Sequence, residues 1–209
     1  MYDNKDDISV IGYSSHSLVV LDAASEAGIS VSHYCEREEK VFNPYKLKYL
    51  GDESSRYFNW NNVNNFIIGI GDNQIRRKIA NLVISQNKQL ISIVHPSAYI
   101  STRSSLGVGN FFAVNSIINA FAKIGNNCIL NTACVIEHEC ILLDHAHIGP
   151  GAILAGNVTV GESSFIGANS VVRQGVTIGE NVIIRAGSVV LHDIPNGEIW
   201  VGNPAKKLK

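Results

Sequence analysis

The chain has 209 residues, of which 45% are hydrophobic and 17% charged, which suits one or two globular domains with a sizeable core. Its 17 Lys and Arg nearly balance its 18 Asp and Glu, without a basic stripe or polybasic run, so we expect neither a nucleic acid nor a membrane as partner. The N-terminal letters MYDNKDD lack the basic and apolar parts of a signal peptide, and no run approaches the roughly 18 apolar residues of a membrane span. Four cysteines fit a reducing compartment, so we expect a cytoplasmic protein.

The first part of the chain alternates short apolar runs with helix-like segments. One helical pattern should end near Gly28, and a second helix can be capped by Asp72 or Asn73. This alternation predicts a small parallel sheet, and we expect a Rossmann-like α/β domain over residues 1–96. Strands are expected at 8–11, 31–35, 66–71 and 91–94.

After residue 96 the apolar period becomes six. A large apolar residue stands at every sixth position from Ile100 to Val190, sixteen times in succession, with a smaller residue two positions before each. Such a period is typical of a parallel β-helix, in which each hexad gives one short strand and one turn, and three hexads close one coil. We therefore expect about five coils with the large residues inside. We expect a Gly or Asn after the large residue to take the turn conformation, as at Gly107, Gly125, Gly149, Gly161, Gly167 and Gly179.

The predicted β-helix domain covers residues 97–209. Stacked coils leave two open ends, which the N-terminal domain and the segment after residue 191 can cover. The hexapeptide pattern resembles that of left-handed β-helices, so left-handedness is implied by the resemblance and not by the repeat itself.

The stretch NTACVIEHEC mixes residues of the repeat with residues that point outward. Cys134 and Cys140, like Cys128 before them, occupy the small inward position, so we interpret them as buried packing residues. A zinc site would favour closer cysteine pairs. His138 and Glu139 fall at an outward corner of a coil, where they can be either solvated residues or part of a site.

Two further histidines, His145 and His147, follow within a few residues. Outward positions on a β-helix can meet in the cleft between packed subunits. If His138, His145 and His147 converged there, they would suit a metal-dependent β-helix enzyme such as a carbonic anhydrase. A non-catalytic scaffold, with these histidines incidental, is the remaining alternative.

Several stretches resemble one family. NTACVIEHEC, HAHIGPGA, AGNVTVG and the terminal VGNPAK are similar to the bacterial nucleotide-sugar N-acetyltransferases of the PglD/NeuD type. In that family a hexapeptide-repeat domain follows a small Rossmann-like domain, and the resemblance covers nearly the whole chain. It implies acetyl-CoA as co-substrate, no metal, and a homotrimer with acetyl-CoA in clefts between adjacent β-helices.

The resemblance implies that acetyl transfer takes place at the coil corner that holds His138 and Glu139. His138 would be the general base that takes a proton from the attacking amine, since a histidine titrates near neutral pH. Glu139 would raise the basicity of that imidazole as its carboxylate neighbour. Gly156 would offer a backbone N–H to the developing oxyanion.

The resemblance also implies contacts with the co-substrate and the acceptor. His147 would hydrogen-bond the pantetheine arm or the thioester region of acetyl-CoA, and backbone groups at Ala168 and Ala186 would contact CoA along the coil wall. Asn131 would help to position the acceptor or the acyl group. Gly71 could let the acceptor approach the backbone, or could be a plain helix-entry turn.

The loop after the first strand, GYSSHS, lies where the family has a nucleotide-binding loop rich in glycine. Ser14 and His16 match that loop, while Ser15 and Ser17 replace glycines, which would stiffen the loop and change its phosphate contact. The strand-to-helix turn would present N–H groups to phosphate, so Ser14, Ser15 and His16 are candidate acceptor ligands. Glu36, where the family usually has Asp, would meet a ribose or base edge.

These features predict an acetyl-CoA-dependent N-acetyltransferase that acts on the amino group of a nucleotide-linked 4-amino-4,6-dideoxy sugar, by direct transfer, for a surface glycan such as the O-antigen of lipopolysaccharide. O-acetylation of a sialic-acid-type sugar is the alternative within the family. The nucleotide and the sugar stereochemistry are left open.

Overall fold

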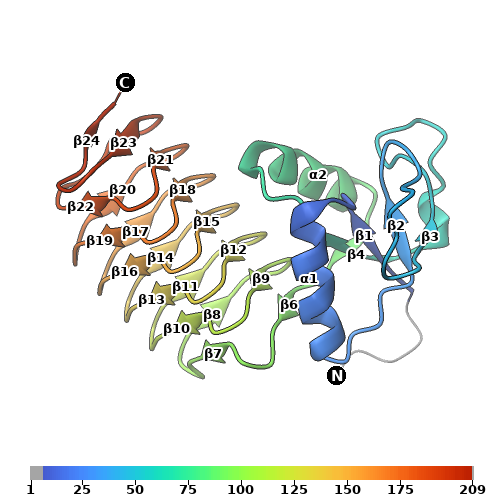
Figure 1. The fold of residues 1–209 in the computed structure, drawn as a ribbon, viewed down its shortest axis with the longest axis horizontal. Coiled ribbons are helices and arrows are strands. Elements are labelled where there is room, and N and C mark those ends of the chain that lie inside the picture. The colour runs from blue at the N-terminus through green and yellow to red at the C-terminus, as the bar shows by residue number, and fades with distance from the viewer. Residues whose placement is uncertain (1–6, 209) are drawn as a thin grey trace.

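A computed structural model describes residues 7–208, so nearly all of the N-terminal letters MYDNKDD lie outside the described residues. A compact sheet domain lies beside the first coils of a long parallel β-helix, and the chain ends at the far end of that β-helix (Figure 1). No helix within this range is both long and apolar enough to cross a bilayer.

The N-terminal domain is an open sheet of parallel strands flanked by helices. Its elements are β1 (Ile8–Ile11), α1 (Ser15–Glu26), β2 (His33–Cys35), β3 (Lys48–Tyr49), η1 (Trp60–Asn62), β4 (Asn65–Ile68), α2 (Asn73–Ser85) and β5 (Gln89–Leu90). The strand order is β3-β2-β1-β4-β5. The predicted helix signals are confirmed, because the Asp72 side chain accepts a hydrogen bond from the Ile75 N–H and Gly28 takes a positive φ just after α1.

The β-helix has three flat faces, which we name after one strand of each. The β15 face contains β6 (Ile93–Val94), β9 (Phe111–Phe112), β12 (Ile129–Leu130), β15 (His147–Ile148), β18 (Phe165–Ile166), β21 (Ile183–Ile184), β23 (Ile199–Val201) and β24 (Lys206–Lys207). The β13 face contains β7 (Tyr99–Ile100), β10 (Ile117–Ile118), β13 (Val135–Ile136), β16 (Ile153–Leu154), β19 (Val171–Val172) and β22 (Val189–Val190). The β14 face contains β8 (Ser105–Leu106), β11 (Lys123–Ile124), β14 (Ile141–Leu142), β17 (Thr159–Val160) and β20 (Thr177–Ile178).

The six-residue period places the core as the sequence predicts from Phe112 to Val190, but the prediction is wrong at Leu106, whose side chain is exposed. Large residues of the repeat such as Ile136 and Leu154 are fully buried inside the prism, and Cys128, Cys134 and Cys140 are buried beside them. Burial raises the pKa of Cys134 to about 12, so its thiol stays protonated and serves as a small packing group.

The strand expected at 91–94 does not close the N-terminal sheet. That sheet ends with β5, whereas Ile93 and Val94 pair with Phe111 and Phe112 on the β15 face. The hexad series therefore starts one repeat before Ile100, with Val94 in the position of the large residue.

The glycines that follow the large residues have a different role from the predicted one. Positive φ occurs three positions after the large residue instead, as at Asn115 and Asn127. At Gly161 an added Cβ would lie 2.4 Å from the backbone of Gly179 in the next coil. These glycines are required because neighbouring coils approach each other closely at this point, not because the turn needs their backbone freedom.

The N-terminal domain covers the first coils on the β15 face. Val20 and Ala24 of α1 pack against the outward-facing Phe111 and Ile129, together with the buried Ile93. Outward positions of these early coils are therefore apolar because they form the interface between the two domains.

Replacing Gly161 by Ala should destabilise the β-helix, because its methyl group would overlap backbone atoms that cannot move aside. We expect a loss of about 1–3 kcal/mol in the free energy of unfolding, measured by denaturant titration. The matched control is Gly71→Ala, whose added Cβ would meet nothing closer than 3.7 Å. Equal stability of the two variants would contradict this account of coil packing.

Candidate active site

His138 and Glu139 form a pair at the corner between the β13 and β14 faces, which we call the His138 corner. The His138 Nδ1 atom lies 3.1 Å from a carboxylate oxygen of Glu139, and the two side chains are 53% and 63% exposed. Since a carboxylate oxygen can only accept, Nδ1 carries the proton that it donates. A neutral His138 therefore has its free lone pair on Nε2, where it can act as a base.

The backbone of the next coil packs against this imidazole at Gly156. A Cβ added to Gly156 would lie 2.5 Å from Cε1 and 2.6 Å from Nε2 of His138, so any side chain at this position would displace the ring. The Gly156 N–H forms no hydrogen bond within residues 7–208. Glu139 has a φ of +62°, at the turn position where this β-helix often has Asn or Gly. A base, its carboxylate and a free backbone donor thus meet at one corner.

His147 lies in a second group, on the β15 face. Its Nδ1 atom lies 3.3 Å from the carbonyl oxygen of Gly71, and its Nε2 atom lies 3.3 Å from the Asn131 side-chain nitrogen. Burial, then the nearby Arg76 and His16, lower the pKa of His147 to about 3. The ring is neutral at pH 7, and because Gly71 can only accept, Nδ1 is protonated and Nε2 is an acceptor.

A cleft of about 320 Å³ opens beside His147, between the start of α2 and the β15 face. His147, Phe165 and Ile183 stack in register along its wall, one from each of three successive coils. The remaining lining residues are Gly71, Asp72, Asn73, Gln74, Ser163 and Asn181. Sequence reasoning missed the contribution of Asn73 and Gln74, because Asn73 was considered only as a helix cap and Gln74 belongs to no recognised motif.

The start of α2 is hydrogen-bonded to corner residues that lie one above another in successive coils of the β-helix. Asn73 donates to the carbonyl of Ser163 at 2.9 Å, and Gln74 donates to the Asn181 side chain at 2.8 Å. Ser163 and Asn181 are 18 residues apart, which is one coil, and both have positive φ. The helix that lines the cleft is therefore held by successive turns of the β-helix.

The predicted residues thus fall into separate groups within one chain. Asn131, His147 and Gly71 come together, whereas His138, Glu139 and Gly156 meet at the corner opposite the β15 face. Ala168 and Ala186 lie one coil apart at the corner between the β15 and β13 faces, where Asn131 also lies. His138 and His147 therefore lie on different sides of the β-helix within one copy of the chain.

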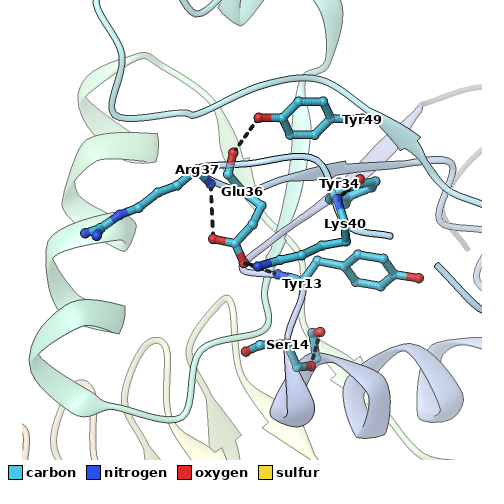
Figure 2. Close-up of polar contacts among 8 residues, drawn as sticks. Tyr13, Ser14, Tyr34, Glu36, Arg37, Lys40 and Tyr49 are labelled. Atoms are coloured by element: carbon cyan, nitrogen blue, oxygen red, sulfur yellow. Dashed lines mark hydrogen bonds and ion pairs between the residues drawn. The ribbon is translucent and has the colours of Figure 1, made fainter. Parts of the chain in front are cut away.

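Glu36 and Ser14 line a second cleft, of about 480 Å³, in the N-terminal domain. The Glu36 carboxylate accepts hydrogen bonds from the N–H groups of Tyr13 and Arg37 and pairs with Lys40 at 3.4 Å (Figure 2). Ser14 precedes α1, but its hydroxyl forms no capping bond, so it is available to a ligand. Ser15, which follows Ser14 directly, is exposed in the first turn of α1. Glu36 is therefore already engaged in fixing the loop that carries Ser14.

His16 lies away from Ser14 and Glu36, contrary to the expectation of one loop site. Its ring contacts Phe111 edge-on at 5.8 Å between centroids and lies 6.3 Å from the ring of His147. Burial, then the charge of Arg76, lower its pKa to about 4. The first turn of α1 points this side chain into the domain interface, which periodicity alone cannot reveal.

The three histidines considered for a metal site do not converge within one chain. His145 is buried, with Nδ1 2.9 Å from the Asn127 side-chain nitrogen, whereas His138 is exposed at its own corner. Across residues 7–208, no group of three or more His, Cys, Asp or Glu residues is placed to hold a metal ion.

Comparisons with known proteins match both halves of the chain. The PglD N-terminal domain family matches residues 7–83, and the bacterial transferase hexapeptide repeats match residues 157–192. The acetyltransferase domain of PglB from Neisseria gonorrhoeae, solved with acetyl coenzyme A, is 30% identical, with a TM-score of 0.90 over 97% of this chain and 99% of that one. The chain belongs to the hexapeptide-repeat acetyltransferases of the PglD type.

Other solved structures agree with this assignment. PerB from Caulobacter crescentus, solved with CoA and GDP-perosamine, is 32% identical, with a TM-score of 0.90 over 98% of each chain. WeeI from Acinetobacter baumannii AYE, at 21% identity and a TM-score of 0.85 over 97% of this chain and 99% of that one, shares the fold. No match was found among curated protein sequences. The predicted family and fold class, with a left-handed β-helix, are confirmed.

His16 and His147 should make the fold sensitive to acid. Their pKa values are about 4 and about 3 in the folded chain, below the ordinary value of 6.5. Well above pH 6.5 both rings are neutral whether the chain is folded or not. Below it, the unfolded chain binds protons that the folded chain does not, so the free energy of unfolding falls until the folded pKa is reached.

Denaturant titrations at pH 7 and pH 5 check this expectation, with a loss of roughly 1–2 kcal/mol for each buried histidine. His147→Asn should lose less stability over this interval than the natural chain, whereas His192→Asn, at an exposed position, should lose as much. Identical losses in both variants would contradict it.

Proposed function

We propose that this protein transfers the acetyl group of acetyl-CoA to an amino group of a nucleotide-linked sugar, with a 4-amino-4,6-dideoxy sugar as the acceptor. The observation that carries the proposal is the His138 corner, where an exposed imidazole with its carboxylate partner lies against a free backbone N–H. Solved relatives at 30–32% identity bind acetyl coenzyme A, or CoA with GDP-perosamine.

The geometry supports direct transfer with His138 as the base. The amine nitrogen attacks the thioester carbonyl carbon, and His138 Nε2 takes the proton that this nitrogen loses. Glu139 stabilises the imidazolium that forms, because its carboxylate holds the Nδ1 proton. The N–H of Gly156 stabilises the oxyanion; the carbon–sulfur bond then breaks, and the proton passes to the leaving thiolate.

The co-substrate would occupy the wall of the β-helix near His147. Ala168 and Ala186 lie one coil apart at one corner, where Ala186 is exposed and Ala168 half-buried, so their small side chains leave room for a ligand beside the backbone. The apolar wall of the cleft, with Phe165 and Ile183, suits the methylene groups of a pantetheine arm. His147 presents an acceptor nitrogen, which suits an amide N–H of that arm.

The acceptor's nucleotide would bind at the N-terminal cleft. The start of α1 has free N–H groups and a positive dipole end, which favour phosphate there. Ser14 and Ser15 supply hydroxyl groups at this helix start. Glu36 holds the loop from the opposite side through the Tyr13 N–H, and Gly71 and Asn131 lie further along, beside His147.

We propose a homotrimer in which each site combines the His138 corner of one copy with the His147 group of the next. The separation of the two groups within one chain supports this assembly. The β13 face, next to the His138 corner, carries an outward column of apolar residues that would be costly to leave in water. These residues are Tyr99, Ile117, Val135, Ile153, Val171 and Val189.

The resemblance to nucleotide-sugar N-acetyltransferases supports the cellular setting that we propose. The reaction would take place in the cytoplasm and would supply a sugar for the O-antigen of lipopolysaccharide or a similar surface glycan.

His138→Ala should lower kcat at least ~100-fold in a thiol-release assay across a panel of UDP-, dTDP- and GDP-linked 4-amino sugars, because a general base contributes about that factor. His192→Ala, an exposed histidine outside the site, should keep full activity. Near-normal turnover by His138→Ala would contradict the role of base.

Mixing two weakened variants tests the shared site. His138→Ala lacks the base, and His147→Ala should have a raised KM for acetyl-CoA with its fold intact. When the two are unfolded and reassembled together, about a quarter of the sites should regain both histidines, which restores activity at low acetyl-CoA. Activity no higher than the sum of the separate variants would mean that each site lies within one copy.

A further inference from the structure

Arg76 in α2 is buried between the two domains, with only 1% of its surface exposed. Its Nε atom donates to the carbonyl of Asn127 at 3.0 Å, and its Nη2 atom donates to the carbonyl of His145 at 2.7 Å. Asn127 and His145 are one coil apart in the column that also holds Ser163 and Asn181. The third donor, Nη1, reaches the carbonyl of Gly71 at 3.0 Å.

This arginine has carbonyl partners and no ion pair within residues 7–208. A buried guanidinium without a counter-charge is costly, and an apolar side chain would fill the same space at lower cost. Three geometrically matched carbonyl groups offset part of that cost, and the planar fork fixes their relative positions.

The Gly71 carbonyl connects Arg76 to the candidate site. This oxygen accepts one hydrogen bond from Arg76 Nη1 and another from His147 Nδ1, which uses both of its lone pairs. Arg76 therefore fixes the position of the acceptor that holds the His147 ring. Burial, and then the positive charge of Arg76, lower the pKa of His147, so the ring stays neutral.

We propose that Arg76 is a positioning residue that acts through the Gly71 carbonyl to hold His147 as the Nδ1-protonated tautomer, with Nε2 free to accept a hydrogen bond from the co-substrate. The inference rests on the proposed function for the role of His147. It goes beyond that function by naming the residue that sets which ring nitrogen faces the ligand. The long 3.3 Å contact from Asn131 to Nε2 can give way to an incoming N–H donor.

Nitrogen NMR of the full-length protein, labelled with ¹⁵N only in histidine, tests the proposal without any substrate. The natural chain should show His147 as a single Nδ1–H tautomer, identified by the loss of its signals in His147→Asn. Arg76→Lys keeps a cation but loses the fork, and Arg76→Gln loses the cation; both should shift His147 to a mixture of tautomers. An unchanged tautomer in the folded Arg76 variants would overturn the proposal.

Arg77 provides the matched control, since it is the next residue of α2 and also ties the helix to the β-helix, through Glu162 at 3.1 Å. Arg77→Gln should leave the His147 tautomer as it is. Loss of the tautomer in this variant as well would mean that any loosening of α2 has the effect, and would overturn a specific role for Arg76.

Steady-state kinetics provide the second test. Arg76→Gln should raise the KM for acetyl-CoA about tenfold, the usual effect of removing a residue that orients a ligand-binding histidine, while kcat changes little. In the His147→Ala background the same substitution should change KM less than about twofold, because the residue through which it acts is gone. Equal increases in both backgrounds would overturn the proposal.

Absence of acetyl transfer by the natural chain would reject the proposed function, and the NMR result would still decide the role of Arg76.

Discussion

The close stacking of identical coils is the constraint on which the rest of this structure depends. Each coil has three hexads, so residues 18 positions apart lie directly above one another, and glycine is required where adjacent backbones approach within van der Waals distance, as Gly161 and Gly179 do. A β-helix packed in this way has rigid corners and fixed columns. Side chains that are distant in sequence are therefore held at constant spacing.

The candidate catalytic groups lie one above another in these columns. His138 stands one coil from Gly156, and this vertical relation brings a base against a backbone donor without any loop to adjust them. The same rigidity keeps His138 away from His147, because the two lie on different sides of the prism. The rigid β-helix thus fixes the His138 corner and the His147 group separately. In the proposed trimer, each active site forms only when two copies bring these groups together.

Periodicity in the sequence predicted most of the buried core, because every sixth residue from Phe112 to Val190 is buried, whereas Leu106 in an earlier hexad is exposed. It also separated Cys134 from His138 within one short stretch, because only the latter falls outside the inward positions. The starting point of the series was wrong by one hexad, because the apolar run that contains Ile93 suits a sheet strand equally well.

Features that depend on docking between domains could not be predicted from the period. The sequence near Asp72 signals a helix start, but nothing local shows that Asn73 and Gln74 face the β-helix. His16 matched a family loop by position, yet the first turn of α1 directs it toward Phe111. Glu139 was found through the family resemblance and not through the repeat, because Phe121, Ala133, His145 and Ser163 also depart from Asn or Gly at the same turn position.

The attachment of α2 to a column of four successive corners has a consequence for how an acceptor would be selected. With Arg76, Asn73 and Gln74 fixed to individual coils, the N-terminal domain has a set height along the β-helix axis. A slip by one coil would move it by about 4.8 Å, the spacing of adjacent strands. In the proposed reaction this fixed height would set the distance between the nucleotide cleft and the thioester. The length of the acceptor's diphosphate linkage would then decide whether the sugar's amine reaches the thioester.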